Sequence, residues 1–233
     1  MSAAPPGTPA PVVTIDGPSG SGKGTVSRLL AQRCGWHLLD SGALYRLVAL
    51  AGESAGLAPE DVPGHVRAAR SMRVEFASDA NGGERVLLDG REVTGRLRTE
   101  STGAGASRVA AWPAVRQALL ERQQAFARPP GLIADGRDMG TVVFPQARLK
   151  IFLTATAEER ALRRYKQLKD KDSSVTLAAL SLDIAERDRR DMTRSTAPLV
   201  PAADAIVLDS TARSVAEVID EVYALGRSRQ LWP

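Results

Sequence analysis

One stretch decides the fold of this chain: Gly17-Pro18-Ser19-Gly20-Ser21-Gly22-Lys23-Gly24-Thr25. It has the P-loop spacing of a glycine, four residues, then glycine and lysine, and it follows the apolar run Val12–Asp16. Small residues let phosphate oxygens approach main-chain N–H groups, and glycine permits the positive φ angles that turn those groups inward. A helix N-terminus and Lys23 would add positive charge. We therefore expect residues 17–25 to bind the phosphates of ATP.

The residue after the lysine separates this loop from its standard form. Gly24 occupies the usual Ser or Thr position, so the hydroxyl that would contact Mg²⁺ comes one residue later, at Thr25. Thr25 also stands where a dinucleotide fingerprint needs its third glycine, which argues against a dehydrogenase. No lysine occurs in the Asn/Thr-Lys-x-Asp pattern of regulatory GTPases. An ATPase without a small-molecule acceptor remains open.

Apolar patterning around the loop predicts a doubly wound α/β fold. Five short runs are continuously apolar, as strands of a parallel sheet covered on both faces are. They are Val12–Asp16, Trp36–Leu39, Leu132–Asp135, Leu149–Leu153 and Ala205–Leu208. Helical periodicity separates them, and capping signatures at Thr156 with Glu159 and at Ser214 with Glu217 open two further helices.

One region interrupts the strand–helix alternation. Arg73–Ala77 and Arg85–Asp89 have the character of two strands around a turn at Asp79–Gly83. A hairpin within an α/β chain predicts a small inserted subdomain, roughly from Gly64 to Gly105. The polar stretch Lys169–Ser174 is predicted to be a loop.

Composition narrows the class of protein. The 233 residues suit one domain with a modest insertion, and 43% hydrophobic with 4% aromatic residues predicts a core of Leu, Val, Ile and Ala. Acidic residues (27) nearly balance Lys and Arg (31), which argues against a nucleic-acid partner. The lone Cys34 forms no intrachain disulfide, and no apolar run approaches the ~18 residues of a membrane span. We expect a disordered tail at 1–10 and a cytoplasmic monomer.

Charged residues that follow two predicted strands could bind a second substrate. Arg46 follows the run that ends at Leu39, and Asp135-Gly136-Arg137-Asp138 follows the run that begins at Leu132. Open α/β sheets bind ligands at the carboxyl ends of their strands. Asp135 could hold Mg²⁺ through water, while Arg137 and Asp138 could reach an acceptor. A solvated arginine and a bare turn are the competing interpretations.

Arginines recur in the last third of the chain. Arg160, Arg163 and Arg164 form one cluster, and helical spacing would place Asp183, Arg187, Asp191 and Arg194 on one face. Surface ion pairing of neighbouring residues is the interpretation that this pattern favours for most of them. Phosphoryl transfer, however, needs positive charge around the migrating group, and an arginine-rich flap supplies it.

Taken together, the motifs resemble those of bacterial cytidylate kinases. The matching segments are Ile15–Gly20, Trp36–Gly42, Ala134–Thr141 and Ala197–Asp204. The second and third are specific to that family. The resemblance implies a P-loop kinase fold with a core at 11–63 and 106–233, a lid at about 157–190, and a monophosphate-binding insert at 64–105. It also implies transfer of the γ-phosphoryl group of ATP to CMP or dCMP with Mg²⁺, in pyrimidine metabolism.

The resemblance further assigns roles to individual residues. Those expected near the phosphate and sugar of CMP are Ser41, Arg46, Arg137 and Arg194, and Tyr45 is a further expected CMP contact. Arg187 and Asp191 would contact the nucleoside, and Ser107, Arg116 and Asp138 would recognise cytosine. Lys23, Arg137 and Arg187 are the expected catalytic residues, Thr25 and Asp135 the metal site, and Arg160, Arg163 and Arg164 the lid. Transfer is expected to be direct and in line, with no covalent intermediate.

Overall fold

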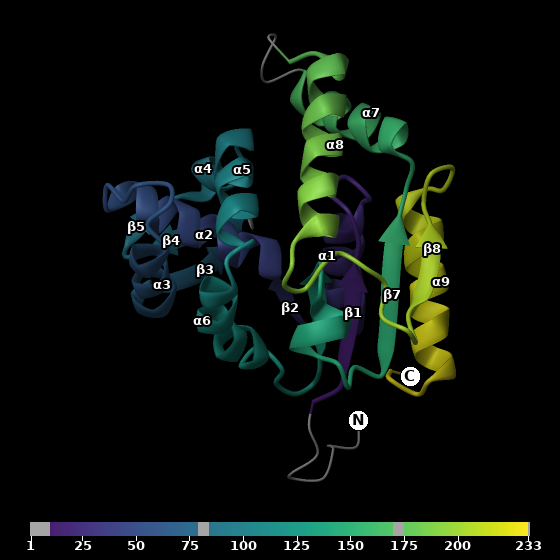
Figure 1. Cartoon of the computed structure of the whole chain (residues 1–233). Coiled ribbons are helices and arrows are strands. Elements are labelled where there is room, and N and C mark those ends of the chain that lie inside the picture. The colour runs from purple at the N-terminus through teal and green to yellow at the C-terminus, as the bar shows by residue number, and fades with distance from the viewer. Residues whose placement is uncertain (1–9, 79–83, 170–174, 233) are drawn as a thin grey trace. The chain divides into compact units, whose positions relative to one another are not determined.

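The structure is a computed structural model that describes residues 10–78, 84–169 and 175–232 (Figure 1). The chain folds into two compact units. The larger contains Met1–Asp40 and Gln123–Pro233, and the smaller contains Ser41–Arg122. The predicted insert, 64–105, lies within the smaller unit. Most of the predicted tail, the hairpin turn Asp79–Gly83 and most of the predicted loop after Lys169 fall outside the described residues.

The larger unit is built on a five-stranded, all-parallel sheet, which confirms the predicted fold class. The strand order is β2-β6-β1-β7-β8. The strands are β1 (Val12–Asp16), β2 (His37–Asp40), β6 (Leu132–Gly136), β7 (Leu149–Thr154) and β8 (Ile206–Asp209). Every residue of β1 and β6 is buried, whereas the edge strands β2 and β8 each have two exposed residues and one buried residue. Each predicted apolar run lies within one or two residues of its strand.

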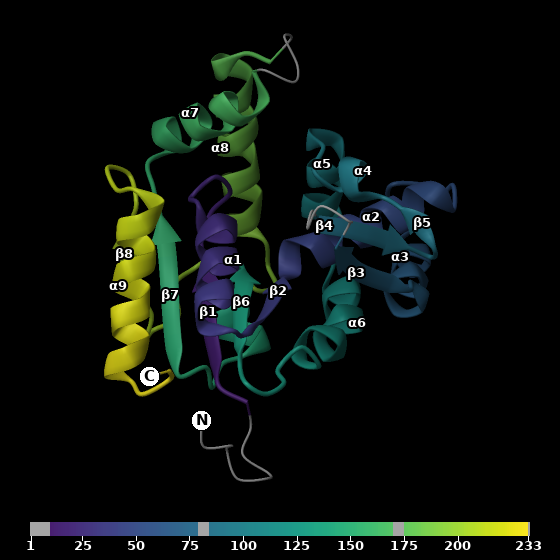
Figure 2. The same cartoon turned by 180° about the vertical axis from the view of Figure 1, so that it is seen from behind.

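Helices of the larger unit cover the sheet and extend beyond its carboxyl end. They are α1 (Lys23–Cys34), the π-helical turn η1 (Met139–Val143), α7 (Ala157–Leu168), α8 (Leu177–Thr193) and α9 (Val215–Ser228). Figure 2 shows α1 and α9 on the same face of the sheet. Figure 1 shows α7 and α8 at the carboxyl ends of the strands, next to the loop that follows β1.

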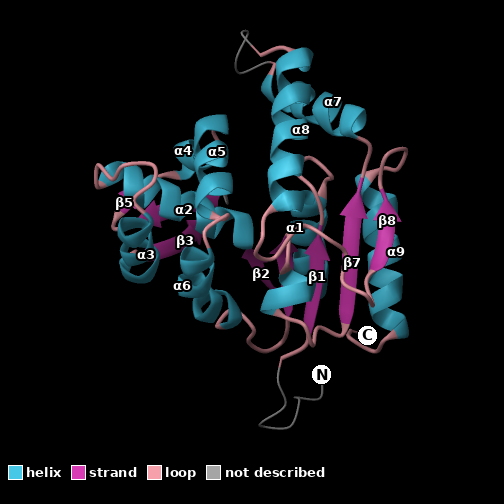
Figure 3. Cartoon of the chain, viewed as in Figure 1, coloured by secondary structure: helices cyan, strands magenta, loops and turns pink. Residues whose placement is uncertain are grey.

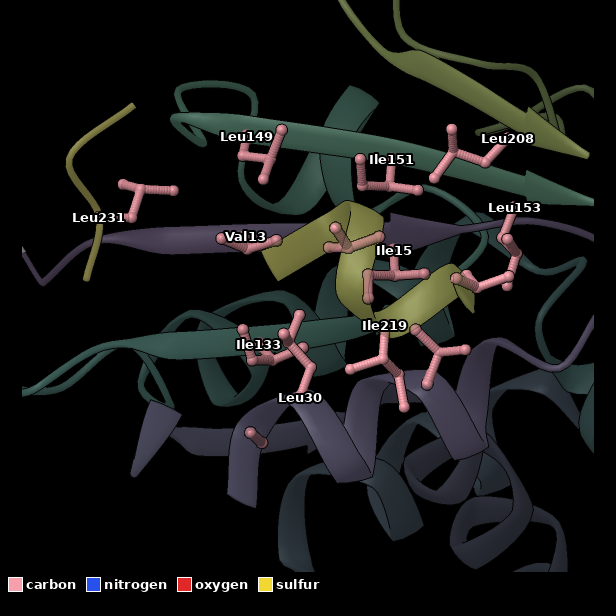
Figure 4. Close-up of a cluster of buried hydrophobic side chains, with 14 of the residues drawn as sticks. Val13, Ile15, Leu30, Ile133, Leu149, Ile151, Leu153, Leu208, Ile219 and Leu231 are labelled. Carbon is pink, nitrogen blue, oxygen red and sulfur yellow. The ribbon is translucent and has the colours of Figure 1, made fainter. Parts of the chain in front are cut away.

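The core of this unit lies between the sheet and the α1–α9 face. Figure 4 shows Val13, Ile15 and Ile133 of the central strands gathered with Leu30 of α1 and Ile219 of α9. Each of the first four side chains is completely buried. Because the strands carry these side chains as continuous apolar runs, the sheet can be covered on both faces. Burial of these side chains stabilises the packing of α1 against the sheet.

Local signals at helix ends are partly as predicted. Ser214 and Glu217 form the complete capping box, and the Thr156 hydroxyl accepts the first of the predicted pair of hydrogen bonds, from the Glu159 N–H. The predicted four-residue face of α8 is wrong at its end. The helix stops at Thr193, and Arg194 has an extended backbone (φ −62°, ψ 140°).

The smaller unit combines helices with a small antiparallel sheet (Figure 3). Its helices are α2 (Ser41–Ser54), α3 (Val62–Ser71), α4 (Thr94–Leu97), α5 (Glu100–Val109) and α6 (Pro113–Gln124), and the last two residues of α6 already belong to the larger unit. Its strands are β3 (Val74–Ser78), β4 (Glu84–Leu88) and β5 (Arg91–Glu92). The predicted hairpin is β3–β4. The sequence did not predict β5, because a strand of two polar residues has no alternating pattern of apolar residues. Across the described part of the chain, no helix combines the length and apolar character needed to cross a bilayer.

Candidate phosphate-binding and acceptor site

The predicted phosphate-binding loop connects the central strand β1 to the N-terminus of α1. Gly22 is the N-cap residue of α1 and has a left-handed backbone, with φ +90°. Among the described residues no side chain caps this helix, and its first turn contains no acidic residue. The first N–H groups of α1 and the positive end of its dipole are therefore available to an anion.

Lys23 bends back along the loop. Its Nζ donates a hydrogen bond to the carbonyl oxygen of Pro18 at 3.1 Å. Burial lowers the pKa of Lys23 to about 7, and the positive charge of Arg137 acts in the same direction, while Asp135 opposes it. The amine therefore lies in surroundings that disfavour its charge, and an anion bound beside it would restore that charge.

The strand register brings Asp135 to the carboxyl end of the sheet, where the phosphate-binding loop also begins. Asp135 pairs with Asp40 of β2 on one side and with Ile15 of β1 on the other. Burial raises the pKa of Asp135 to about 7, against the opposing charge of Lys23. Its Oδ1 is buried and accepts a hydrogen bond from none of the described residues. A buried carboxylate oxygen of this kind can still accept a ligand.

Sequence reasoning missed the structural role of Asp16, the last residue of β1. Its two carboxylate oxygens accept hydrogen bonds from the N–H groups of Met139 (2.9 Å) and Gly140 (2.8 Å). Burial raises the pKa of Asp16 to about 6, and these two hydrogen bonds oppose that rise. Asp16 thereby fixes the first two residues of η1. An acidic residue at the end of a fully apolar run was the signal that could have identified it.

The structure brings together Arg137 and Asp191, which the resemblance implied to be two substrate-binding residues. The Arg137 Nε donates to the Asp191 Oδ2 at 3.0 Å, and both side chains are largely buried. Burial works against the charge of Arg137, but the neighbouring Asp191 outweighs it and raises the pKa of Arg137. Burial likewise disfavours the Asp191 carboxylate, yet the charges of Arg137 and Arg187 hold the pKa of Asp191 below its usual value. Arg187 is also close enough to Lys23 to lower the pKa of that lysine.

Arg194 follows α8, where its Nε donates to the Ala197 carbonyl at 2.6 Å. Asp183, predicted to share a face with Arg194, is exposed. Asp183, Arg187 and Asp191 keep the predicted four-residue spacing within α8, and only Arg194 leaves it, because it belongs to the segment that follows the helix.

The three predicted lid arginines lie on α7 and differ in their partners. Arg160 is buried, and its Nη1 donates to the carbonyl of Ser19 in the phosphate-binding loop at 3.1 Å. Arg163 is half-buried, and its Nη1 donates to the Ser21 carbonyl at 3.3 Å. The Arg164 Nη1 donates to the Gln167 side chain at 3.1 Å. Two of the three thus contact the loop that follows β1.

The smaller unit contains the other predicted acceptor residues. On α2, Ser41 and Tyr45 are buried, and the Arg46 Nη1 donates to the carbonyls of Leu97 (2.8 Å) and Thr99 (3.2 Å). These contacts tie Arg46 to the segment between α4 and α5.

Two residues predicted to recognise cytosine also belong to the smaller unit. Arg116 of α6 is buried, donates to the Ala110 carbonyl at 3.1 Å, and places its guanidinium carbon 5.5 Å from the ring centroid of Tyr45. The Ser107 hydroxyl of α5 is buried and makes a hydrogen bond to none of the described residues. The third such residue, Asp138, is buried in the larger unit.

Comparison with known proteins identifies the family. The family model for cytidylate kinase matches residues 13–228. A cytidylate kinase of Pseudomonas fluorescens (strain Pf0-1) is 58% identical over 216 residues, covering 92% of this chain and 94% of the relative. A cytidylate kinase from Pseudomonas aeruginosa (strain UCBPP-PA14) is 58% identical over 213 residues, covering 91% of this chain and 93% of the relative. A cytidylate kinase from Marinomonas sp. (strain MWYL1) is 54% identical over 214 residues, covering 92% of this chain and 94% of the relative. The chain that carries this loop and these arginines belongs to the cytidylate kinase family.

Proposed function

We propose that this protein transfers the γ-phosphoryl group of ATP to CMP or dCMP, which yields ADP and CDP or dCDP. The observation that supports it most is the cluster in the larger unit: an uncapped helix N-terminus and Lys23 lie within electrostatic range of Arg137, Arg187 and Asp135. A triphosphate needs such a cradle, and a migrating phosphoryl group needs positive charge around it. We further propose that the protein works on these small molecules as a cytoplasmic monomer.

In this proposal the loop residues 17–25 bind the triphosphate through main-chain N–H groups. Lys23 contributes a full charge to the β- and γ-phosphates, and Arg137 and Arg187 stabilise the charge that spreads over the transferred group. The phosphate of CMP is already anionic at neutral pH, so the acceptor oxygen needs no general base. Transfer then proceeds in line, directly from one nucleotide to the other.

The residues present also fit a bound Mg²⁺. The buried Asp135 Oδ1 has an unused acceptor position, and Thr25 offers a hydroxyl on the first turn of α1. No group of three His, Cys, Asp or Glu side chains gathers in the described ranges. Kinase Mg²⁺ is held by one or two carboxylates, water and substrate phosphates rather than by a protein cage. When bound, Mg²⁺ would neutralise the phosphate oxygens of ATP; Asp135, directly or through water, and Thr25 would hold it.

Acceptor recognition is proposed to use the residues that the resemblance implied. Ser41, Arg46, Arg137 and Arg194 would bind the phosphate and sugar of CMP, Tyr45 would contact CMP, and Arg187 and Asp191 would contact the nucleoside. Cytosine presents an N4 amino donor and two acceptors, N3 and O2. Asp138 can accept from N4, while Arg116 and the unsatisfied Ser107 hydroxyl can donate to the acceptors.

An ADP-release assay tests the proposal. Purified protein, ATP and Mg²⁺ are mixed with CMP, dCMP, UMP or no acceptor, and ADP is measured with coupling enzymes. We expect rapid ADP release with CMP or dCMP and little without an acceptor. ADP release that is equally fast in the absence of any monophosphate would instead identify an ATPase and refute the proposal.

A further inference from the structure

The carbonyl groups of the phosphate-binding loop make contacts that the proposed reaction does not use. The Ser19 carbonyl accepts a hydrogen bond from the Arg160 Nη1 at 3.1 Å. The Ser21 carbonyl oxygen lies 3.0 Å from the Ser210 Oγ and accepts a hydrogen bond from the Arg163 Nη1 at 3.3 Å. All of these donors belong to the larger unit and approach from α7 or from the end of β8.

Peptide geometry gives these contacts a consequence. In a planar trans peptide the C=O and N–H groups point in opposite directions. The Ser19 carbonyl shares its peptide with the N–H of Gly20, and the Ser21 carbonyl shares its peptide with the N–H of Gly22. A donor that holds either carbonyl on the α7 side therefore turns the partner N–H away from α7, toward the interior of the loop.

The Ser210 side chain is well placed to hold one of these peptides. It is 3% exposed, and its Oγ lies 3.0 Å from both the Ser21 and Thr154 carbonyl oxygens, to one of which its hydroxyl donates. The same Oγ accepts a hydrogen bond from the Arg163 Nη1 at 3.0 Å. A neutral hydroxyl thus occupies the centre of the contact, so its removal changes no charge near the nucleotide.

The guanidinium group of Arg163 is committed to the same arrangement. Its Nε donates to the Glu159 carboxylate at 2.8 Å, and its Nη2 donates to the Ser210 carbonyl at 2.6 Å. Nη1 serves Ser210 and Ser21, so all three nitrogen atoms have partners within the protein. This orientation requires a planar fork of donors, which a lysine cannot provide.

Arg160 provides a second fixed donor on α7. Its Nη2 forms an ion pair with the Asp188 carboxylate at 2.6 Å, and its Nε donates to the Ala155 carbonyl at 3.0 Å. Gly20 has a φ of +80°, and a Cβ at that position would lie 3.0 Å from the Arg160 Cβ. The loop therefore packs directly on α7, without room for a side chain.

We propose that Ser210, together with Arg163, is a positioning residue for ATP: the pair holds the Ser21 carbonyl so that the Gly22 N–H faces the triphosphate. The inference rests on the proposed function in taking ATP as the ligand. It differs from the predicted lid role of Arg163, in which that guanidinium would act on the nucleotide through its own charge.

The test compares Ser210→Ala with a matched control, Ser228→Ala, whose exposed hydroxyl also donates to a backbone carbonyl, that of Leu225. Loss of one such hydrogen bond should weaken ADP binding, measured by calorimetry without CMP, by about 3- to 10-fold. The KM for ATP should rise similarly, while the KM for CMP and the values for the control stay unchanged. In protein labelled with ¹⁵N-glycine, the ADP-induced shift of the Gly22 amide should shrink.

A second variant separates geometry from charge. Arg163→Lys keeps the positive charge but loses the fork, so we expect the same selective loss of ADP affinity, and less than additive loss in the double variant. Wild-type ADP affinity in both single variants would overturn the proposal. So would an equal rise of the KM for CMP and ATP accompanied by a lower melting temperature, which indicates general damage. Failure of the proposed function would appear separately, as wild-type protein that binds ADP but ignores CMP.

Discussion

At the scale of single residues, charge placed in buried surroundings dominates the site. Lys23, Asp135 and Asp16 all have pKa values shifted toward their neutral forms, chiefly by burial. Each shift means that the folded protein holds the charged group at a cost, which bound phosphate or a metal ion can offset.

Replacement of Lys23 should separate activity from stability. In Lys23→Ala we expect kcat in the ADP-release assay to fall by at least about 10²-fold, because the charge that meets the β- and γ-phosphates is lost. The melting temperature should hold or rise, since a buried charge is removed. Lys166→Ala, on the exposed part of α7, is the control and should keep wild-type kcat. Substantial turnover in Lys23→Ala would contradict the role given to the loop.

Asp16 should link stability to pH. Its pKa rises from 3.8 to about 6 on folding, so the stability it contributes is complete below about pH 4 and is lost as pH rises through about 6. Such a shift corresponds to about 3 kcal/mol. The difference in unfolding free energy between wild type and Asp16→Asn, measured by denaturant titration, should therefore shrink between pH 4 and pH 7. A constant difference across that range would show that Asp16 titrates normally.

Base recognition should depend on Asp138. Uracil places O4 where cytosine has its N4 donor, so UMP would set an acceptor against this carboxylate. We expect UMP to lose about 1–3 kcal/mol, roughly 5- to 150-fold in kcat/KM relative to CMP. Asp138→Asn can donate to O4, so it should reduce the ratio of kcat/KM for CMP to that for UMP. Asp220→Asn, on the exposed face of α9, should leave this ratio unchanged. Equal use of CMP and UMP by the wild type would contradict this assignment.

At the scale of helices and strands, the continuous apolar runs were sufficient to predict the sheet, and the glycine-lysine pattern predicted the β1–loop–α1 connection. Sequence alone could not show where α8 ends, because Arg194 fits the helical period although its backbone is extended. Nor could it show that Arg160 and Arg163 contact loop carbonyls, since the spacing of charges along a helix does not reveal partners far away in the chain. The Arg160–Asp188 pair joins two helices, α7 and α8.

Packing of α1 against the sheet fixes the helix to which the phosphate-binding loop is joined. Leu30 is completely buried between α1 and the sheet, so Leu30→Ala should leave a cavity and lower the unfolding free energy by about 2–5 kcal/mol. Leu182→Ala on α8 is the control, because Leu182 is 73% exposed. Denaturant unfolding measures both. If Leu30→Ala lowered the unfolding free energy as little as Leu182→Ala does, the core between α1 and the sheet would not be tightly packed.

At the scale of the whole molecule, the chain divides into two compact units, and the predicted acceptor residues are distributed over both. The hairpin predicted an insertion at 64–105, but periodicity could not show that α2 and α6 belong to the same compact unit, because it reveals an apolar face and not its partner. Nor could the sequence show that the Ser107 hydroxyl is buried and has no hydrogen-bond partner among the residues that the structure describes.

The most direct test of the central claim follows the phosphorus atoms themselves. A mixture of the protein, ATP, CMP and Mg²⁺ is observed by ³¹P NMR as the reaction proceeds. Direct transfer predicts that the α- and β-phosphate signals of CDP grow in step with those of ADP, with no inorganic phosphate. Growth of the inorganic phosphate signal while the CMP signal stays constant would contradict phosphoryl transfer between nucleotides.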